Sequence, residues 1–239
     1  MTENEARDAI IIALDMSFEE AIELTDKLSG KAVWVKVGMT LFYRYGPSMV
    51  DEFKKRGFKV FLDWKLHDIP FQIRGAAYSA SLSGADILSI HGLGGAQMIE
   101  EGRKGTEEAA EERSGERTKL IAISVLTSMD QEALASIGVE SPVDQEVERL
   151  AKLATGAGAD GIVCSPQEAQ RMRELLGPHA WIITPGIRPA GADVGDQKRI
   201  STPASAIAAG ATKLVIGRPI TKAEDPVAAF DAIVAELTA

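Results

Sequence analysis

The sequence predicts a single (β/α)8 barrel of the TIM type, an α/β fold that occupies residues 1–239 as one catalytic domain. Eight short apolar segments alternate with segments of helical spacing, as expected for parallel strands that are buried on both faces and connected by helices. Eight strands in 239 residues match the usual size of this barrel, whereas a doubly wound sheet usually has fewer strands. No change in composition and no Pro- or Ser-rich linker marks a second domain.

Each predicted strand is an apolar run bounded by polar or glycine-rich turns. In chain order the eight runs are Ala9–Asp15, Val33–Val37, Lys59–Asp63, Ile87–His91, Leu120–Leu126, Gly161–Cys164, Trp181–Thr184 and Lys213–Ile216. Short buried strands of this kind are expected when parallel strands are buried on both faces and connected by helices.

The segments between these strands have the spacing of amphipathic helices. They are Phe18–Leu28, Pro47–Arg56, Ile73–Ser83, Asp144–Gly156, Gln167–Leu176 and Pro203–Ala209, and Pro226–Leu237 follows the last strand and would close the ring. The charged stretch Glu100–Lys119 carries charges of both signs, so we expect a solvated helix and loop rather than an interaction tail.

The composition argues against several kinds of protein and site. Lys and Arg number 26 against 35 Asp and Glu, giving a net charge of −9, whereas a nucleic-acid-binding surface needs a basic face. Cys164 is the only cysteine, which excludes an intrachain disulfide and a thiolate metal cluster. The apolar run Ala9–Leu14 is too short for a signal sequence or a membrane span. We therefore expect a cytoplasmic protein that binds neither nucleic acid nor membrane.

Charged residues stand where the first three predicted strands end. Asp15 ends the first strand, Lys36 lies within the second, and the third continues into Asp63, Lys65 and Asp68. In a (β/α)8 barrel the chemistry is placed at the carboxyl ends of the strands. On an extended backbone Asp63 and Lys65 would point to the same side, because residues two apart share a face. Asp68 lies beyond them, on the loop.

Alternating lysines and aspartates keep one another ionised. Such an array can place a negative charge against a substrate carboxylate and an ammonium group near the carbon that loses it. The alternative is a set of salt bridges that closes the barrel rim. The position of Lys36 favours a functional array, because an ammonium group inside an apolar strand costs several kcal/mol unless it is paired or used.

A second candidate cluster follows the last two strands. Thr184–Arg199 is rich in Gly, Pro and Ala, which suits a loop that closes over a ligand, and it is followed later by Val215–Thr221. The loops after strands seven and eight usually hold phosphate in this fold. Gly217 would allow close backbone approach, and Arg218 could give paired hydrogen bonds to a phosphate. For Arg218 the alternative is a surface salt bridge.

The remaining polar candidates have structural alternatives that the sequence leaves open. Arg188 and Gln197 could be solvated loop residues, and Thr127, after the fifth strand, could belong to a turn or a helix cap. The three histidines lack the spacing of zinc ligands, so no metal site is expected. His91 ends the fourth strand, where we expect it to orient loop backbone rather than to act as an acid or base.

In these motifs the sequence resembles the orotidine 5'-monophosphate decarboxylase family from the first strand to the eighth. The most specific motif is D-x-K-x-x-D-I-P at Asp63–Pro70. The matching segments are IIALD, VWVKVG, FLDWKLHDIP, SIHGLGG, VLTSMD, TPGIRP with Gln197 after it, and VIGRPIT. The resemblance implies decarboxylation of a pyrimidine nucleotide to uridine 5'-monophosphate, the last step of de novo pyrimidine synthesis, with no cofactor and no metal.

The resemblance also implies roles for individual residues. Lys36, Asp63, Lys65 and Asp68 would form the family's charged array, with Asp68 reaching the site of a second subunit in a homodimer. The substrate contacts implied by the resemblance are Asp15 and Lys36 on the ribose, Thr127 on the pyrimidine ring, and Arg188, Gln197, Gly217 and Arg218 on the 5'-phosphate. The chain departs from the family where Phe71-Gln72 replaces the usual Asn-Thr after Ile69-Pro70.

Two other functions remain open at the level of sequence. Phosphosugar decarboxylases and synthases on the same type of barrel also use an Asp-x-Lys motif in the third strand, but they require a metal ion. The D-I-P continuation and the T-P-G-I-R-P loop favour the nucleotide enzyme. A catalytically silent barrel that only binds nucleotides could lose the lysines, and Lys36 and Lys65 are both present.

Overall fold

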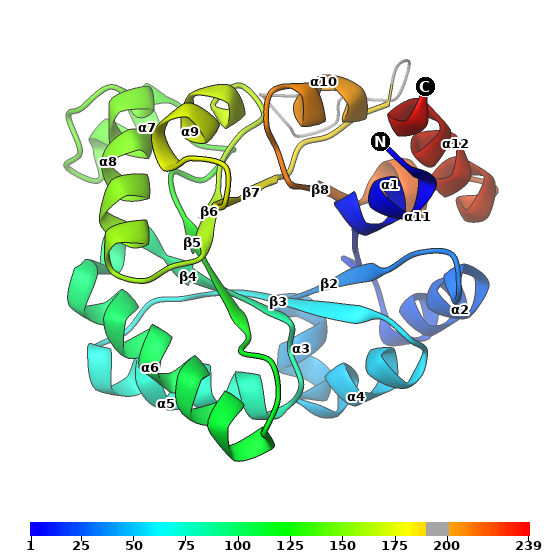
Figure 1. The fold of residues 1–239 in the computed structure, drawn as a ribbon, viewed down its shortest axis with the longest axis horizontal. Coiled ribbons are helices and arrows are strands. Elements are labelled where there is room, and N and C mark those ends of the chain that lie inside the picture. Colours follow the sequence, from blue (N-terminus) through cyan, green and yellow to red (C-terminus); the bar gives the residue numbers. More distant parts are fainter. Residues whose placement is uncertain (190–200) are drawn as a thin grey trace.

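The computed structural model describes residues 1–189 and 201–239, and within them the chain forms a closed barrel of eight parallel strands in sequence order. Helices surround the strands on all sides (Figure 1). The strands are β1 (Ile10–Ala13), β2 (Trp34–Gly38), β3 (Lys59–Leu66), β4 (Ile87–His91), β5 (Lys119–Ile123), β6 (Gly161–Val163), β7 (Trp181–Thr184) and β8 (Lys213–Ile216). The predicted (β/α)8 fold is confirmed, and each predicted strand overlaps an observed one.

Each predicted helix overlaps an observed one, and further helices occur that were not predicted. In order they are α1 (Glu3–Ala9), α2 (Phe18–Leu28), α3 (Met39–Tyr45), α4 (Ser48–Lys55), α5 (Pro70–Leu82), the 3-10 turn η1 (Gly92–Gly94), α6 (Ala96–Arg113), α7 (Gln131–Ser136), α8 (Val143–Gly156), α9 (Ala169–Leu176), α10 (Pro203–Ala208), α11 (Arg218–Thr221) and α12 (Pro226–Thr238). No helix in the described ranges is both long and apolar enough to cross a bilayer.

Several short helices were not predicted. The first, α1, precedes β1 and is held by a capping box in which Thr2 and Glu5 satisfy each other's backbone N–H groups. The helix predicted to start at Ile73 begins at Pro70 instead, because proline fits the first helical position, where its missing N–H is not needed. The charged stretch after residue 100 is helical as far as Arg113, and one side of that helix is buried.

Helices α5 and α6 lie side by side, with α5 packed against β3 and β4 and α6 against β5 (Figure 1). Gly105 of α6 makes the approach possible, because a Cβ atom there would overlap the carbonyl oxygen of Arg74 and lie 3.0 Å from the backbone nitrogen of Tyr78. Both clashing atoms belong to the α5 backbone, so neither can move aside alone. The pair therefore depends on glycine at this contact.

Substituting Gly105 by alanine should lower the free energy of unfolding by about 2 kcal/mol, because the added methyl group forces two packed helices apart. The measurement is urea-induced unfolding followed by circular dichroism. Gly75→Ala is the matched control, since a Cβ on this α5 glycine meets no atom within 4 Å. That control should be neutral or stabilising. Equal losses in both variants would contradict the packing argument.

Apolar side chains fill the interior of the barrel below the strand ends. This inner cluster contains Ile11, Ala13, Trp34, Phe61, Ile87, Ile121, Ile183 and Val215, all of them at most 9% exposed. A separate and larger cluster packs the outer faces of the strands against the helices. The barrel is therefore a packed core in its lower part, as is usual for this fold.

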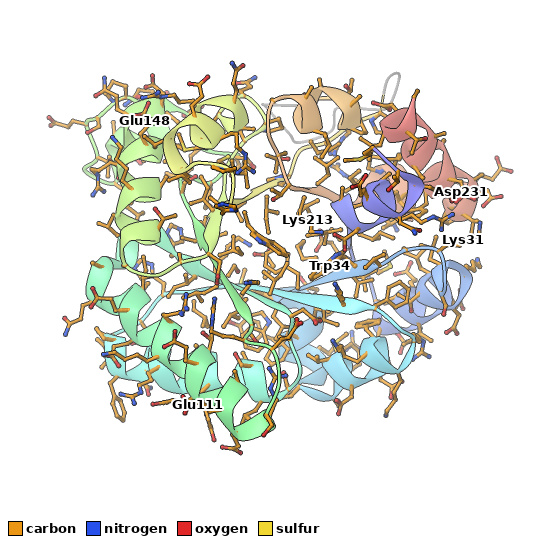
Figure 2. The ribbon with its side chains drawn as sticks, viewed as in Figure 1. Lys31, Trp34, Glu111, Glu148, Lys213 and Asp231 are labelled. Atoms are coloured by element: carbon orange, nitrogen blue, oxygen red, sulfur yellow. The ribbon has the colours of Figure 1, made fainter. Side chains whose placement is uncertain are left out.

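Four residues close the N-terminal end of the strands, and together we call them the barrel floor: Asp8, Trp34, Trp181 and Lys213. The two indole rings meet edge to face at 6.2 Å, and Lys213 Nζ lies 5.0 Å from the Trp34 ring centroid. Asp8 accepts hydrogen bonds from Trp34 Nε1 at 2.9 Å and from Lys213 Nζ. Figure 2 shows Lys213 and Trp34 inside the ring of helices.

Candidate active site

A cavity of about 500 Å³ opens at the opposite end of the barrel, where the strands finish. Its walls combine charged, polar and apolar side chains from most strands of the barrel. The lining residues predicted from sequence are Asp15, Lys36, Asp63, Lys65, Thr127, Arg188, Gly217 and Arg218. Eight of the ten predicted site residues thus meet in one cavity.

Lys36 and Asp63 form the buried centre of the charged array. Lys36 Nζ lies 3.4 Å from Asp63 Oδ2 and 3.2 Å from Asp15 Oδ1, and Lys65 Nζ lies 2.9 Å from Asp63 Oδ1. The Lys36 and Asp63 side chains are only 10% and 13% exposed, whereas Asp15 is 68% exposed. Charges therefore alternate from Asp15 to Lys65 along the ends of the first three strands.

The array keeps both buried groups ionised. Burial alone would raise the pKa of Asp63, but the charges of Lys36 and Lys65, with hydrogen bonds from Lys65 and Ser89, outweigh it and lower that pKa. Burial alone would lower the pKa of Lys36, yet attraction to Asp63 and then Asp15 raises it. Both groups are therefore ionised at neutral pH and over a wide pH range on either side of it.

These shifts predict how stability depends on pH. The lowered pKa of Asp63 makes its ionised form stabilising above the usual value of 3.8, and this contribution is lost as the pH falls through the folded-state pKa. The raised pKa of Lys36 means that its charged form stabilises the fold fully below the usual value of 10.5. This contribution is lost as the pH rises through the folded-state pKa. The unfolding free energy of wild type minus that of Asp63→Asn should stay constant between about pH 5 and 9. This difference in unfolding free energy should become smaller in acid, which urea titrations at several pH values would measure. A difference that changes with pH near neutrality would contradict the assignment of Asp63 as ionised there.

Lys65 joins the array, but its backbone conformation differs from the one predicted. Its backbone is in the left-handed region, with φ of 53°, and the pairing of β3 with β4 shifts register between Leu62 and Leu66. The prediction of a regular extended strand is therefore wrong at Lys65. Trp64 packs outward on Phe42, with ring centroids 3.8 Å apart, and Lys65 turns back toward Asp63.

Asp68 does not join the array within one chain. It is exposed on the loop between β3 and α5, is not among the cavity-lining residues, and accepts a hydrogen bond from the backbone N–H of Ile69 at 2.6 Å. Within one chain, the predicted Lys-Asp-Lys-Asp array therefore contains Lys36, Asp63 and Lys65 but not Asp68.

The part of the cavity wall that follows β7 and β8 is basic. Arg188 is buried at 7% exposure, and its guanidinium donates to the carbonyl oxygen of Ile187 at 2.8 Å. Arg218 begins α11 directly after Gly217, and both line the cavity. Among the described residues, the atoms nearest to a Cβ on Gly217 would be those of Ala13, at 3.6 Å and 3.9 Å. Gln197, the other predicted residue of this group, lies outside the described residues.

The histidines near the site stack on each other. The rings of His67 and His91 are 5.2 Å apart and nearly parallel, and His91 Nδ1 accepts from the backbone N–H of Leu93 at 3.4 Å. Burial, followed by the charges of His67 and Lys65, lowers the pKa of His91. Within the described ranges no three His, Cys, Asp or Glu side chains converge as metal ligands would. His91 thus contacts loop backbone, as predicted.

Sequence reasoning missed two residues that contact the array. Ser89, in β4, donates a hydrogen bond to Asp63 Oδ1 at 3.0 Å. At Gly38, the last residue of β2, a Cβ atom would lie 3.3 Å from Asp15 Oδ1 and 3.5 Å from Lys36 Nζ, so a side chain would press on that ion pair. The hydroxyl between apolar neighbours in ILSIH was the available signal for Ser89.

Comparison with known proteins agrees with this geometry. Residues 8–233 match the family described as "Orotidine 5'-phosphate decarboxylase / HUMPS family". The chain belongs to this family. A curated member from Cutibacterium acnes, named orotidine 5'-phosphate decarboxylase, is 48% identical over 225 residues, which cover 93% of each chain. A member of the same name from Moorella thermoacetica is 47% identical and covers 97% of this chain and 93% of its own.

The solved structures of the family share the fold. The crystal structure of orotidine 5'-phosphate decarboxylase from Lactobacillus acidophilus has a TM-score of 0.86 and 37% sequence identity, and the match covers 96% of this chain and 99% of that one. The resemblance inferred from the motifs is confirmed at the level of the family.

Proposed function

We propose that the chain decarboxylates orotidine 5'-monophosphate to uridine 5'-monophosphate and CO2, without cofactor or metal, as the last step of de novo pyrimidine synthesis. The observation that carries the proposal is the buried Lys36–Asp63–Lys65 array, which lines the same cavity as Arg188 and Arg218. The names of the curated relatives support it. The barrel would act as one catalytic domain in the cytoplasm.

The proposed reaction needs electrostatic help rather than an electron sink. When the bond between carbon 6 and the carboxylate breaks, the electron pair stays on carbon 6, which has no adjacent carbonyl group to absorb the charge. Lys65 stabilises this carbanion and then transfers a proton to carbon 6, giving the product. Its position beside ionised Asp63 keeps the ammonium group preorganised for both tasks.

Asp63 faces the departing carboxylate in this proposal, and Lys36 holds Asp63 in place. Lys36 and Lys65 both contact Asp63, so the negative charge of its carboxylate is compensated before substrate binds. A substrate carboxylate can therefore enter despite Asp63. Preorganised stabilisation of the carbanion by Lys65 is the main contribution, and ground-state repulsion by Asp63 adds to it.

The rest of the substrate is assigned to the other walls of the cavity. Asp15 and Lys36 bind the ribose hydroxyl groups, and Thr127, which lines the cavity after β5, contacts the pyrimidine ring. The 5'-phosphate is bound by Arg188, Gln197, Gly217 and Arg218, because arginine guanidinium groups give paired hydrogen bonds to phosphate.

We also propose a homodimer in which Asp68 enters the partner's site. Asp68 is exposed beside two large apolar residues, Ile69 and Phe71, which are 62% and 80% exposed. Tyr43, at 77% exposure, belongs to the helix after the neighbouring strand. Apolar side chains so exposed near one loop suit a protein interface. Phe71, which replaces the family's usual Asn, adds apolar surface there. Mixing Lys65→Ala and Asp68→Ala proteins, each inactive alone, should restore activity if sites are shared.

One assay separates this function from its rivals. Loss of orotate absorbance should follow addition of the wild-type protein to orotidine 5'-monophosphate in EDTA. A phosphosugar decarboxylase would be silent in that assay and would release CO2 from its own substrate only with magnesium. A silent nucleotide-binding barrel would bind uridine 5'-monophosphate in calorimetry and turn over neither substrate. Either result would overturn the proposal.

A further inference from the structure

Ser89 makes two hydrogen bonds that join the reacting side chains to the scaffold. Its Oγ donates to Asp63 Oδ1 at 3.0 Å and accepts from the backbone N–H of Lys65 at 2.9 Å. The residue is fully buried in β4. A hydroxyl has one proton to give, so these two partners define its orientation: the proton goes to the carboxylate, and a lone pair faces the N–H.

The local strand pairing explains why a side chain is needed here. Leu62 pairs with Leu88 and Leu66 pairs with Ile90, so three residues of β3 lie opposite the single residue Ser89 of β4. In a bulge of this kind the extra residues are left out of the ladder. The Lys65 N–H would therefore lack its usual strand partner, and the Ser89 hydroxyl takes that place.

The same hydroxyl orients the Asp63 carboxylate. Asp63 Oδ1 receives Ser89 Oγ and Lys65 Nζ, while Oδ2 faces Lys36 Nζ at 3.4 Å. Both carboxylate oxygens are thus assigned to partners, which limits rotation of the group. The left-handed backbone of Lys65 is a conformation that non-glycine residues adopt at a cost, so it needs surrounding contacts to persist.

We propose that Ser89 is a positioning residue for the reaction, which holds the Asp63 carboxylate and the backbone of Lys65 in register with each other. The inference rests on the proposed function. Ser89 is not among the residues that line the cavity, so it acts through Asp63 and Lys65 rather than on the substrate. Its loss should affect the chemical step and leave the phosphate and ribose contacts in place.

The test uses a matched pair of substitutions at this position. Threonine and valine have nearly the same shape, but only threonine keeps the hydroxyl. Ser89→Val and Ser89→Ala should lower kcat for orotidine 5'-monophosphate by roughly ten- to hundred-fold, the usual effect of losing a hydrogen bond to a charged group. KM should change less than threefold or so, since the binding contacts remain. Ser89→Thr should recover most of kcat.

Controls separate this inference from general damage and from failure of the proposed function. Ser124→Ala removes a buried hydroxyl at the end of the neighbouring strand, which donates a hydrogen bond to the carbonyl oxygen of Val163 at 2.8 Å, and it should leave kcat unchanged. Thermal unfolding checks that each variant is folded. If wild type turns over the substrate but Val and Thr variants lose kcat equally, or Ser89→Ala keeps it, the inference is wrong. If wild type itself is inactive on the nucleotide, the proposed function has failed instead.

Discussion

Replacing Lys65 by alanine should lower kcat for orotidine 5'-monophosphate by roughly 10⁴-fold, the largest effect expected of any single substitution in this chain. Two contributions would be lost together, because in the proposed mechanism the same ammonium group stabilises the developing carbanion and supplies the proton that replaces CO2. The variant should still bind the product, since no phosphate contact is assigned to Lys65. Single-turnover decay of orotate absorbance in EDTA measures the chemical step directly.

Lys59→Ala is the matched control for this measurement. Lys59 begins the strand that Lys65 nearly ends, and its Nζ lies over the Trp34 ring at the barrel floor, 5.1 Å from the centroid. Removing it takes away one lysine of the same strand far from the cavity, so kcat should stay within about twofold of wild type. A Lys65→Ala variant that keeps more than a tenth of wild-type kcat would remove the proposed role.

The second large effect is expected for Asp63→Asn. The substitution keeps the shape of the side chain, but among the described residues it leaves buried Lys36 with Asp15 as its remaining carboxylate partner, and Asp15 is itself 68% exposed. Breaking a buried ion pair from one side costs about 3 kcal/mol or more, so the free energy of unfolding should fall by that amount. We also expect kcat to fall by roughly 10³-fold, because Lys65 loses the carboxylate that orients it.

Urea unfolding and steady-state kinetics on the same preparation test both parts. Asp15→Asn is the stability control: it also removes a carboxylate from Lys36, but an exposed one, and should cost less than about 1 kcal/mol. Equal losses of stability in the two variants would show that Asp63 is not the principal partner of Lys36. Loss of stability with unchanged kcat would make the array structural, the alternative that the sequence left open.

The sequence predicted the cavity better than it predicted the backbone that builds it. Lys36 was identifiable because an ammonium group interrupts an apolar strand, and Asp63 and Lys65 because they end the next one. The register shift in β3 was not identifiable, since alternation assumes a regular strand and the bulge depends on pairing with β4. Ser89 was missed for the same reason, because its partner is fixed by that pairing.

Some short helices at the rim of the barrel could not be predicted from the sequence either. Helices α3 and α11 have seven and four residues, too few for apolar periodicity to show, and they are stabilised by packing on the barrel. For α1 a signal was present, since Thr2 and Glu5 have the spacing of a capping box. Sequence spacing alone does not assign a partner to Asp68, and its proposed contact with a second subunit rests on the family resemblance.

The barrel floor has a consequence for the passage of molecules through the enzyme. Asp8, Trp34, Trp181 and Lys213 shut the end of the barrel that lies away from the cavity, and the inner apolar cluster fills the space between. In the described part of the chain, the reactant and both products would therefore pass through the same open end of the cavity. In the proposed reaction, carbon dioxide would form beside Asp63, and the nucleotide's phosphate would bind near Arg218. Under this proposal, carbon dioxide would pass the bound nucleotide or leave after it, which would couple the release of the two products in time.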